Sequence, residues 1–293
     1  MGDAPAGRAL LGIDVGGTKV ALRAEDETGR SDQVVFSWPE PAGAEADWKS
    51  LTATVEDFRT GWGGDFDAVG VAMPATVGPD GQVVSWPGRP GWAGFGLGPA
   101  LAQLFAGRPV GWADDGDLAA LAEAAHAGCD HLVYLGVGTG VGGGIVHDGA
   151  WLPGPGRGSC EAGHIVVDRD GPRCDCGRRG CVQATAAGPA TLRRAAQWRG
   201  APVDFPALRA ALAEHTTWAV RAVDESCAAL AAAVVSLNEL FRPELTVLGG
   251  GFATALPGFV DRVDAYTRSL ARAGGPRPEI RPAALGGLSS LHG

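Results

Sequence analysis

The chain has 293 residues, 45% of them hydrophobic and 19% charged, which suffices for a substantial buried core and excludes a disordered chain. Its 24 basic and 33 acidic residues give a net charge of −9, which argues against a nucleic-acid backbone or an anionic membrane surface as partner. No apolar run reaches the about 18 residues of a membrane span, and residues 1–8 lack the apolar core of a signal peptide. We therefore expect a cytoplasmic protein that binds neither nucleic acid nor a membrane.

Predicted strands and helices alternate along the chain. In chain order we expect strands at 9–15, 20–24 and 67–73, a Gly-, Pro- and Trp-rich loop at 85–98, a helix at 117–127, strands at 131–137 and 143–147, a loop at 151–180, a helix at 218–241 and a strand at 245–248. Asp117 is the expected cap of the helix at 117–127. This order of elements favours an α/β fold.

A short internal repeat suggests two similar lobes. Residues 11–17, Leu-Gly-Ile-Asp-Val-Gly-Gly, resemble residues 135–141, Leu-Gly-Val-Gly-Thr-Gly-Val. Each copy is expected to form a strand, a glycine turn and the start of a second strand. Two such hairpins predict two related lobes with facing glycine turns.

The first glycine turn, residues 14–19, has groups that suit a phosphate. The N–H groups of Gly16 and Gly17 can approach anionic oxygens, because glycine lets the backbone come close to a ligand. Thr18 adds a hydroxyl, and Lys19 adds a charge; Lys19 and Lys49 are the only lysines in the chain. Asp14 suits a Mg²⁺ ion bound through water. The alternative is a plain hairpin turn, and a Walker A loop is excluded because that motif requires lysine where Thr18 stands.

Two further glycine clusters are candidates for nucleotide contacts. Gly138-Thr139-Gly140 begins a G-x-G-x-x-G pattern, but a strand follows it where the dinucleotide fold needs a helix. We therefore expect a second phosphate-binding hairpin and no nicotinamide or flavin site. Gly250 and Gly251, after a buried strand, would let an adenosine lie against the backbone; the alternative is a simple strand-to-helix turn.

Three clustered cysteines predict a structural metal site. Cys174, Cys176 and Cys181 lie in a predicted loop, and His164 stands ten residues upstream of the first. Three thiolates and one imidazole complete a closed tetrahedral zinc shell, which leaves no open position for catalysis. Unrelated surface thiols are the alternative. Cys129, Cys160 and Cys227 are expected to be buried small side chains.

In this order the motifs resemble the ROK family of bacterial sugar kinases and sugar-responsive repressors. The segments that carry the resemblance are 12–19, 114–115, 138–144, Glu-Ala-Gly-His at 161–164, the cysteine motif at 174–181, and 248–251. The resemblance implies a two-lobed, actin-like (ribonuclease-H-like) α/β fold with sugar and ATP in the cleft, and a homodimer. The small lobe would comprise residues 1–114 joined by a C-terminal helix at about 282–293, and the large lobe residues 115–281 with the zinc loop at 160–183.

The resemblance also implies a role for each motif. Asp14 and the glycines after it match the family's first phosphate loop, and Gly138 to Gly140 match the second. Asp115 matches the catalytic base, which takes the proton of a sugar hydroxyl; the alternative for a carboxylate at this place is a helix cap. Glu161 and His164 match sugar-binding residues, so the zinc loop would position the sugar pocket. ATP, Mg²⁺ and a structural Zn²⁺ are the cofactors implied.

Two departures from the family pattern bear on the substrate. The resemblance implies that both Asp114 and Gln183 bind the sugar. Asp114 stands where the family has an Asn that contacts the hydroxyls near C3 and C4, and Gln183 where it has a Glu near the C1 and C2 hydroxyls. An ionised carboxylate only accepts hydrogen bonds, and its bond to an ammonium is about twice as strong as a neutral one. The exchange of Asn for Asp at residue 114 therefore favours a 3-amino sugar. The leading candidate is kanosamine (3-amino-3-deoxyglucose), which would be phosphorylated on its 6-hydroxyl in antibiotic-precursor biosynthesis. A glucokinase and a kinase of C7 cyclitols remain the alternatives.

A regulator is the alternative from another functional class. A repressor of this family needs a helix-turn-helix domain before the first phosphate loop, and 13 residues precede Asp14. A non-catalytic sugar sensor would not need Asp14, Asp115 and both glycine loops. We therefore expect an ATP-dependent sugar kinase.

An aromatic, proline-stiffened loop lies between the first two family motifs. It contains Trp86, Pro87, Pro90 and Trp92. Tryptophan packs well on sugar faces and is also frequent in interfaces. A wall of the sugar cleft and a dimer contact are both open interpretations of this loop.

Overall fold

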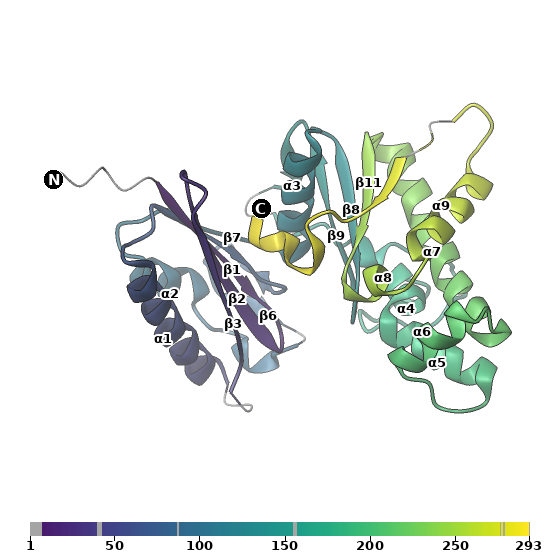
Figure 1. The fold of residues 1–293 in the computed structure, drawn as a ribbon, viewed down its shortest axis with the longest axis horizontal. Coiled ribbons are helices and arrows are strands. Elements are labelled where there is room, and N and C mark those ends of the chain that lie inside the picture. Colours follow the sequence, from purple (N-terminus) through teal and green to yellow (C-terminus); the bar gives the residue numbers. More distant parts are fainter. Residues whose placement is uncertain are drawn as a thin grey trace. The chain divides into compact units, whose positions relative to one another are not determined.

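The computed structural model describes residues 8–39, 43–86, 88–154, 157–275, 277 and 279–292 (Figure 1). The described residues form two compact units. Unit 1 takes its residues from Met1–Leu118, Pro153–Ser159 and Ser290–Gly293, and unit 2 takes its residues from Ala119–Leu152 and Cys160–Ser289. Among the described residues no helix is long and apolar enough to cross a membrane.

Unit 1 is built on a five-stranded sheet in the order β3-β2-β1-β4-β7. Its strands are β1 (Ala9–Val15), β2 (Lys19–Asp26), β3 (Ser31–Ser37), β4 (Ala68–Ala72) and β7 (Val110–Ala113). The first three form an antiparallel meander, whereas β4 pairs in parallel with β1, and β7 with β4. The other elements are α1 (Ala44–Trp62), β5 (Thr76–Val77), β6 (Val83–Ser85), the 3-10 helix η1 (Pro90–Trp92) and α2 (Leu97–Leu104).

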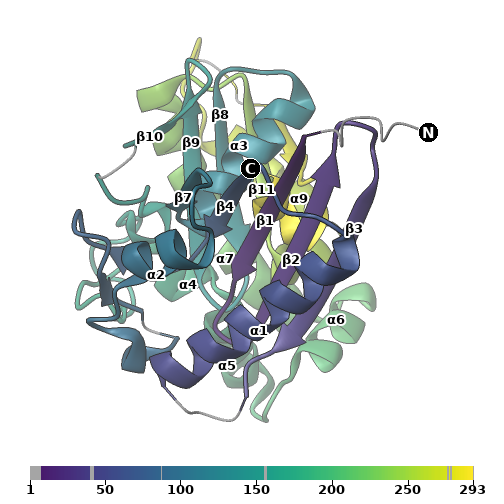
Figure 2. The same ribbon diagram turned by 90° about the vertical axis from the view of Figure 1, so that its left-hand side faces the viewer.

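Successive side chains of β1 alternate between the core of unit 1 and the opposite face of the sheet. Leu11, Ile13 and Val15 are buried and pack with residues of α1 and α2, which Figure 2 shows in front of this sheet. Because successive side chains of a strand point to opposite faces, Asp14 lies on the other face of β1. The strand thus contributes apolar residues to the core while it presents a carboxylate at its end.

Unit 2 repeats the sheet topology of unit 1. Its sheet has the order β10-β9-β8-β11-β12, again with three antiparallel strands and two that continue in parallel. These strands are β8 (Leu132–Val137), β9 (Val141–His147), β10 (Ala150–Leu152), β11 (Leu245–Gly249) and β12 (Glu279–Pro282). The hairpin β8–β9 occupies the place of β1–β2, as the internal repeat predicts.

Helices cover both faces of the second sheet, as Figure 1 shows. The helices of this part of the chain are α3 (Asp115–Ala127), η2 (Ala162–His164), α4 (Val182–Ala186), α5 (Gly188–Arg199), α6 (Phe205–Ala213), α7 (Thr217–Phe241), α8 (Gly251–Ala255), α9 (Phe259–Leu270) and η3 (Gly286–His292). Alanines of α3 pack against one face of the sheet, and α7 and α9 pack against the other. The C-terminal helix expected at about 282–293 is instead the short 3-10 helix η3, which follows β12.

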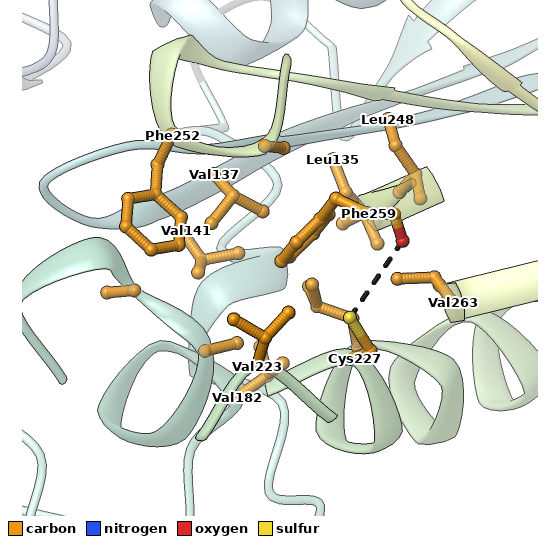
Figure 3. Packing of buried hydrophobic residues seen from close by; sticks show 14 of the residues in the cluster. Leu135, Val137, Val141, Val182, Val223, Cys227, Leu248, Phe252, Phe259 and Val263 are labelled. Carbon is orange, nitrogen blue, oxygen red and sulfur yellow. Dashed lines mark hydrogen bonds between the residues drawn. The ribbon is translucent and has the colours of Figure 1, made fainter. Parts of the chain in front are cut away.

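The larger core lies between the second sheet and α7 (Figure 3). Cys227 and Val223 of α7 face Phe259 and Val263 of α9, and Leu135 lies above them from β8. The Cys227 thiol lies 3.8 Å from the carbonyl oxygen of Phe259, and burial raises its pKa to about 12. Cys227 is thus an inert core side chain, as expected.

The cysteines and the helix expected at 117–127 differ from the prediction in two details. Cys129 and Cys160 are half-buried, not buried. The helix expected from residue 117 begins at Asp115, because the carboxylate of Asp114 accepts the N–H of Gly116 at 3.0 Å and so caps it. Asp117 is buried within the first turn.

Candidate functional site

The structure brings the carboxylates of Asp14 and Asp115 together in unit 1. Asp14 ends β1, and Asp115 begins α3 directly after β7, two strands away in the same parallel set. The negative charge of Asp115 raises the pKa of Asp14, so the two groups are close enough to repel. Carboxyl ends of parallel strands meet at one edge of a sheet, which explains this meeting of distant segments.

Burial dominates the ionisation of both carboxylates. It raises the pKa of Asp14, against the opposing effects of a 3.0 Å hydrogen bond from Ser290 Oγ and the charge of Lys19. Burial also raises the pKa of Asp115, while a hydrogen bond from the Gly116 backbone lowers it. A carboxylate with a raised pKa holds a proton more readily, which suits a general base.

The first glycine turn presents two backbone amides. The N–H of Gly16 donates to the carbonyl oxygen of Lys19 at 3.0 Å and closes the hairpin. Within the residues that the structure describes, the N–H groups of Gly17 and Thr18 have no acceptor. Thr18 and Lys19 are exposed. Two adjacent amides and a lysine at one turn are a suitable set for an anion.

The second glycine turn is held by Gln183 of α4. The N–H of Gly138 donates to the Gly140 carbonyl oxygen at 2.9 Å, and Thr139 between them is exposed. Gln183 Oε1 accepts the N–H of Val141 at 3.1 Å. Gln183 thus lies against the turn, a contact between distant segments that the motifs do not indicate, and its expected contact with the sugar stays a prediction.

The third glycine cluster is a strand-to-helix turn. Gly250 has a φ of +85° and joins β11 to α8, which begins at Gly251. A Cβ atom at residue 250 would lie 2.4 Å from the Val137 nitrogen, so only glycine fits there. The turn therefore lies against the end of β8, next to the second glycine turn.

The four expected zinc ligands lie together in unit 2. The ligand atoms of His164, Cys174, Cys176 and Cys181 all lie within 4.8 Å of one another. His164 Nδ1 is 3.6 Å from Cys174 Sγ, and the sulfurs of Cys176 and Cys181 are 3.6 Å apart. A tetrahedral zinc ion sets sulfur ligands about 3.8 Å apart, and sulfur and nitrogen about 3.6 Å, whereas a disulfide requires about 2.05 Å. The residues fit the metal.

Glu161 lies on the other side of the same histidine. Its Oε2 atom is 3.9 Å from His164 Nε2, and Glu161 precedes the short helix η2 that carries His164. One ring nitrogen thus faces the cysteines and the other faces a carboxylate. A carboxylate on the second nitrogen of a metal-binding histidine orients the ring.

The aromatic loop does not line a site in the way the sequence suggested. Trp86 is 2% exposed and Trp92 is 1% exposed, and both belong to the core of unit 1. The expectations of a sugar-cleft wall and of a dimer contact are both wrong for these two side chains. Pro87 lies outside the described residues.

Comparison with known proteins assigns the chain to a family. The profile of the ROK family matches residues 10–293. The chain belongs to the ROK family. It is 51% identical over 283 residues to the kanosamine kinase of Amycolatopsis mediterranei, across 97% of this chain and 93% of that protein.

Solved structures of the family share its α/β sugar-kinase fold. The ROK hexokinase from Thermus thermophilus has a TM-score of 0.84 at 34% identity, covering 97% of this chain and 95% of that one. The ROK glucokinase from Streptomyces griseus, in complex with glucose and AMPPNP, has a TM-score of 0.80 at 28% identity, covering 97% and 96%.

We predict that Asp115→Asn stabilises the fold at neutral pH. Because the folded-state pKa of Asp115 lies above its usual value of 3.8, the folded protein holds this proton more tightly than the unfolded chain. The ionised carboxylate therefore destabilises the fold above the folded-state pKa, and this effect disappears as the pH falls toward 3.8. Urea unfolding should show a higher free energy of unfolding for the variant at pH 7.5, and a difference that shrinks as the pH is lowered to 4.

The matched control for this prediction is Asp57→Asn, which removes an exposed carboxylate from α1. Its difference from the wild type should not change with pH in this way. An advantage of Asp115→Asn that stays constant from pH 7.5 down to pH 4 would contradict the raised pKa.

Proposed function

We propose that this protein is an ATP-dependent sugar kinase that phosphorylates the 6-hydroxyl of kanosamine. The observation that carries the proposal is the Asp114–Asp115 pair at the start of α3, in a chain that is 51% identical to a kanosamine kinase over nearly its full length. Family membership supports the phosphoryl transfer, and the charge at residue 114 supports the amino sugar.

Asp115 is the proposed catalytic base. Its carboxylate accepts the proton of the sugar hydroxyl while the hydroxyl oxygen attacks the γ-phosphorus of ATP, and ADP leaves with the electron pair of the broken bond. Burial prepares Asp115 for this step, because its raised pKa increases its affinity for the proton.

The first glycine turn and Asp14 are the proposed phosphate and magnesium groups. The amides of Gly17 and Thr18 would bind phosphate oxygens, and Asp14 would hold Mg²⁺ through water. The acidic pair fits a cation, since the Asp14 and Asp115 carboxylates repel each other without one. The ion, when bound, neutralises charge on the phosphate oxygens.

Asp114 is the proposed specificity residue. Its Oδ1 atom accepts the N–H of Gly116, and an ionised carboxylate can accept several hydrogen bonds at once. An ammonium at C3 of the sugar would form a charge-assisted bond with it, which a hydroxyl at that carbon cannot match. Glu161 and His164 are the proposed partners of other sugar hydroxyls.

A glucokinase is the second candidate. The similarity to the Streptomyces griseus glucokinase, whose structure holds glucose and AMPPNP, favours it. A hydroxyl can also donate to Asp114, so the geometry at residue 114 alone does not separate the two substrates.

The proposed function is tested by ADP release with Mg-ATP on kanosamine, glucose, glucosamine, mannose and a C7 cyclitol. We expect the highest kcat/KM with kanosamine. Asp115→Asn is the negative control; it should bind the sugar but lose turnover, and activity that persists would come from another base or a contaminating kinase. A preference for glucose would replace kanosamine by the second candidate, and no turnover of any sugar would favour a sugar sensor.

We predict that Asp114→Asn shifts the preference from kanosamine toward glucose. The ratio of kcat/KM for kanosamine to that for glucose should fall roughly 10- to 100-fold, because one charge-assisted hydrogen bond is lost. Asparagine also caps helices well, so the fold should be kept. Glucose turnover serves as the internal control, and an unchanged ratio would remove Asp114 from substrate selection.

We also propose that His164, Cys174, Cys176 and Cys181 bind a structural zinc ion. Their spacing in the structure supports this, and four protein ligands leave no position for chemistry at the metal. Because His164 faces Glu161 with its second nitrogen, the ion would fix the orientation of both proposed sugar ligands.

The zinc proposal predicts one metal ion per chain and a loss on removing one ligand. Cys176→Ser should lose the zinc, lower the melting temperature by roughly 5 °C or more and raise the KM for the sugar. Cys129→Ser, which changes a cysteine outside the cluster, should keep the metal. Elemental analysis and thermal unfolding measure both, and a Cys176→Ser variant with a full complement of zinc would refute the ligand set.

The family resemblance further supports a homodimer and a cytoplasmic location, which we propose on that ground. Light scattering of the purified protein would measure its mass in solution, and fractionation of the producing cells would test the location.

A further inference from the structure

The carbonyl oxygens of the first glycine turn are held by two side chains from outside the hairpin. Trp38, just after β3, donates its indole N–H to the Gly16 carbonyl oxygen at 2.7 Å. Arg89, just before η1, donates Nη1 to the Gly17 carbonyl oxygen at 3.2 Å. Neighbouring peptide groups of the turn are thus each fixed by a separate donor.

Arg89 is itself fixed by a buried carboxylate of α1. Its Nε and Nη2 atoms donate to Asp47 Oδ2 and Oδ1 at 2.8 and 3.0 Å. Trp92 donates its indole N–H to the same Asp47 Oδ2 at 2.8 Å. The Asp47 side chain is 1% exposed and that of Arg89 is 14% exposed. All three guanidinium nitrogens therefore have a partner, and the planar fork has one orientation available.

Stability alone gives little reason for this arrangement. A buried ion pair loses much of its attraction to desolvation, and apolar side chains of similar volume often stabilise a core as well. The ion pair does fix the orientation of the Arg89 guanidinium, which also lies 5.0 Å above the Trp38 ring. Trp38 and Arg89 thus support each other while each one holds a carbonyl of the turn.

Fixing these carbonyls also fixes the two amides that would meet a phosphate. The peptide group is planar and trans, so the C=O of one residue and the N–H of the next point in opposite directions. The bond to the Gly16 carbonyl therefore orients the N–H of Gly17, and the bond to the Gly17 carbonyl orients the N–H of Thr18. Without these bonds the glycine backbone would have wide conformational freedom.

We propose that Trp38 and Arg89 are positioning residues for nucleotide binding. They hold the Gly17 and Thr18 amides in the orientation that binds phosphate oxygens, and Asp47 holds Arg89 for this task. The inference rests on the proposed kinase function. It adds a group of three side chains that act through the backbone of the turn.

The first test compares Trp38→Phe with Trp62→Phe. Phenylalanine keeps a ring at residue 38 but removes the donor to Gly16. Trp62 lies in the core of the same unit with a similar exposure, 5% against 8% for Trp38, so its exchange controls for the loss of indole packing. We expect Trp38→Phe to raise the KM for Mg-ATP roughly tenfold and to change the KM for the sugar less than about twofold. Trp62→Phe should leave both values close to the wild type.

The second test uses Arg89→Lys, which keeps the charge beside Asp47. A lysine has a single nitrogen and cannot reproduce the fork that contacts Asp47 and Gly17 together. It should raise the KM for Mg-ATP in the same way, and calorimetry should show weaker binding of a non-hydrolysable ATP analogue without sugar. Thermal unfolding checks that each variant is folded.

The outcomes separate this inference from the proposed function. A wild-type protein that phosphorylates no sugar would contradict the proposed function. An active wild type whose Trp38→Phe and Arg89→Lys variants keep their KM for Mg-ATP would overturn the positioning role. Equal increases for nucleotide and sugar would overturn it as well, since they indicate a general loosening of the unit.

Discussion

In both sheets the strands that follow the antiparallel meander run parallel to its first strand, β1 or β8, and this pairing decides where the candidate residues gather. Asp14 lies beside Ala72, and Ala72 beside Ala113, so the chain reaches Asp114 and Asp115 at the same edge as the first glycine turn. In unit 2, Gly136 pairs with Gly249, which brings the second and third glycine turns to one edge. Side chains about a hundred residues apart thus meet without any local signal.

The cost of this arrangement is electrostatic. Two carboxylates, Asp14 and Asp115, end up close together and partly away from water, and the pKa of each rises. Without a cation between them, two such negative charges repel each other and destabilise the folded protein. A bound cation would reduce this repulsion. The same local excess of negative charge would attract an ammonium on a sugar. Under the proposed function, one feature of the unit would thus serve proton transfer, metal binding and choice of substrate.

The sequence predicted the parts of the site that depend on local spacing. The glycine turns and the cluster of His164 with three cysteines lie where the motifs placed them, because each is encoded within a few residues of backbone. What it missed are contacts between distant segments. Asp47 and Arg89 are 42 residues apart, and Gln183 meets Val141 across the same distance in sequence. The burial of Trp86 and Trp92, and the capping of α3 by Asp114 in place of Asp117, also depend on packing that no spacing encodes.

The scarcity of lysine has a practical consequence for this molecule. Amine-directed reagents can modify only Lys19 and Lys49 among the side chains. Both side chains are exposed: Lys19 follows the turn whose Gly17 and Thr18 amides are open to an anion, and Lys49 lies on α1. Acylation chemistry, which labels most proteins at many places, is therefore confined to two side chains here. A Lys49→Arg variant would leave Lys19 as the one side chain that such a reagent labels, so that a fluorophore there would report on the first glycine turn without an engineered cysteine.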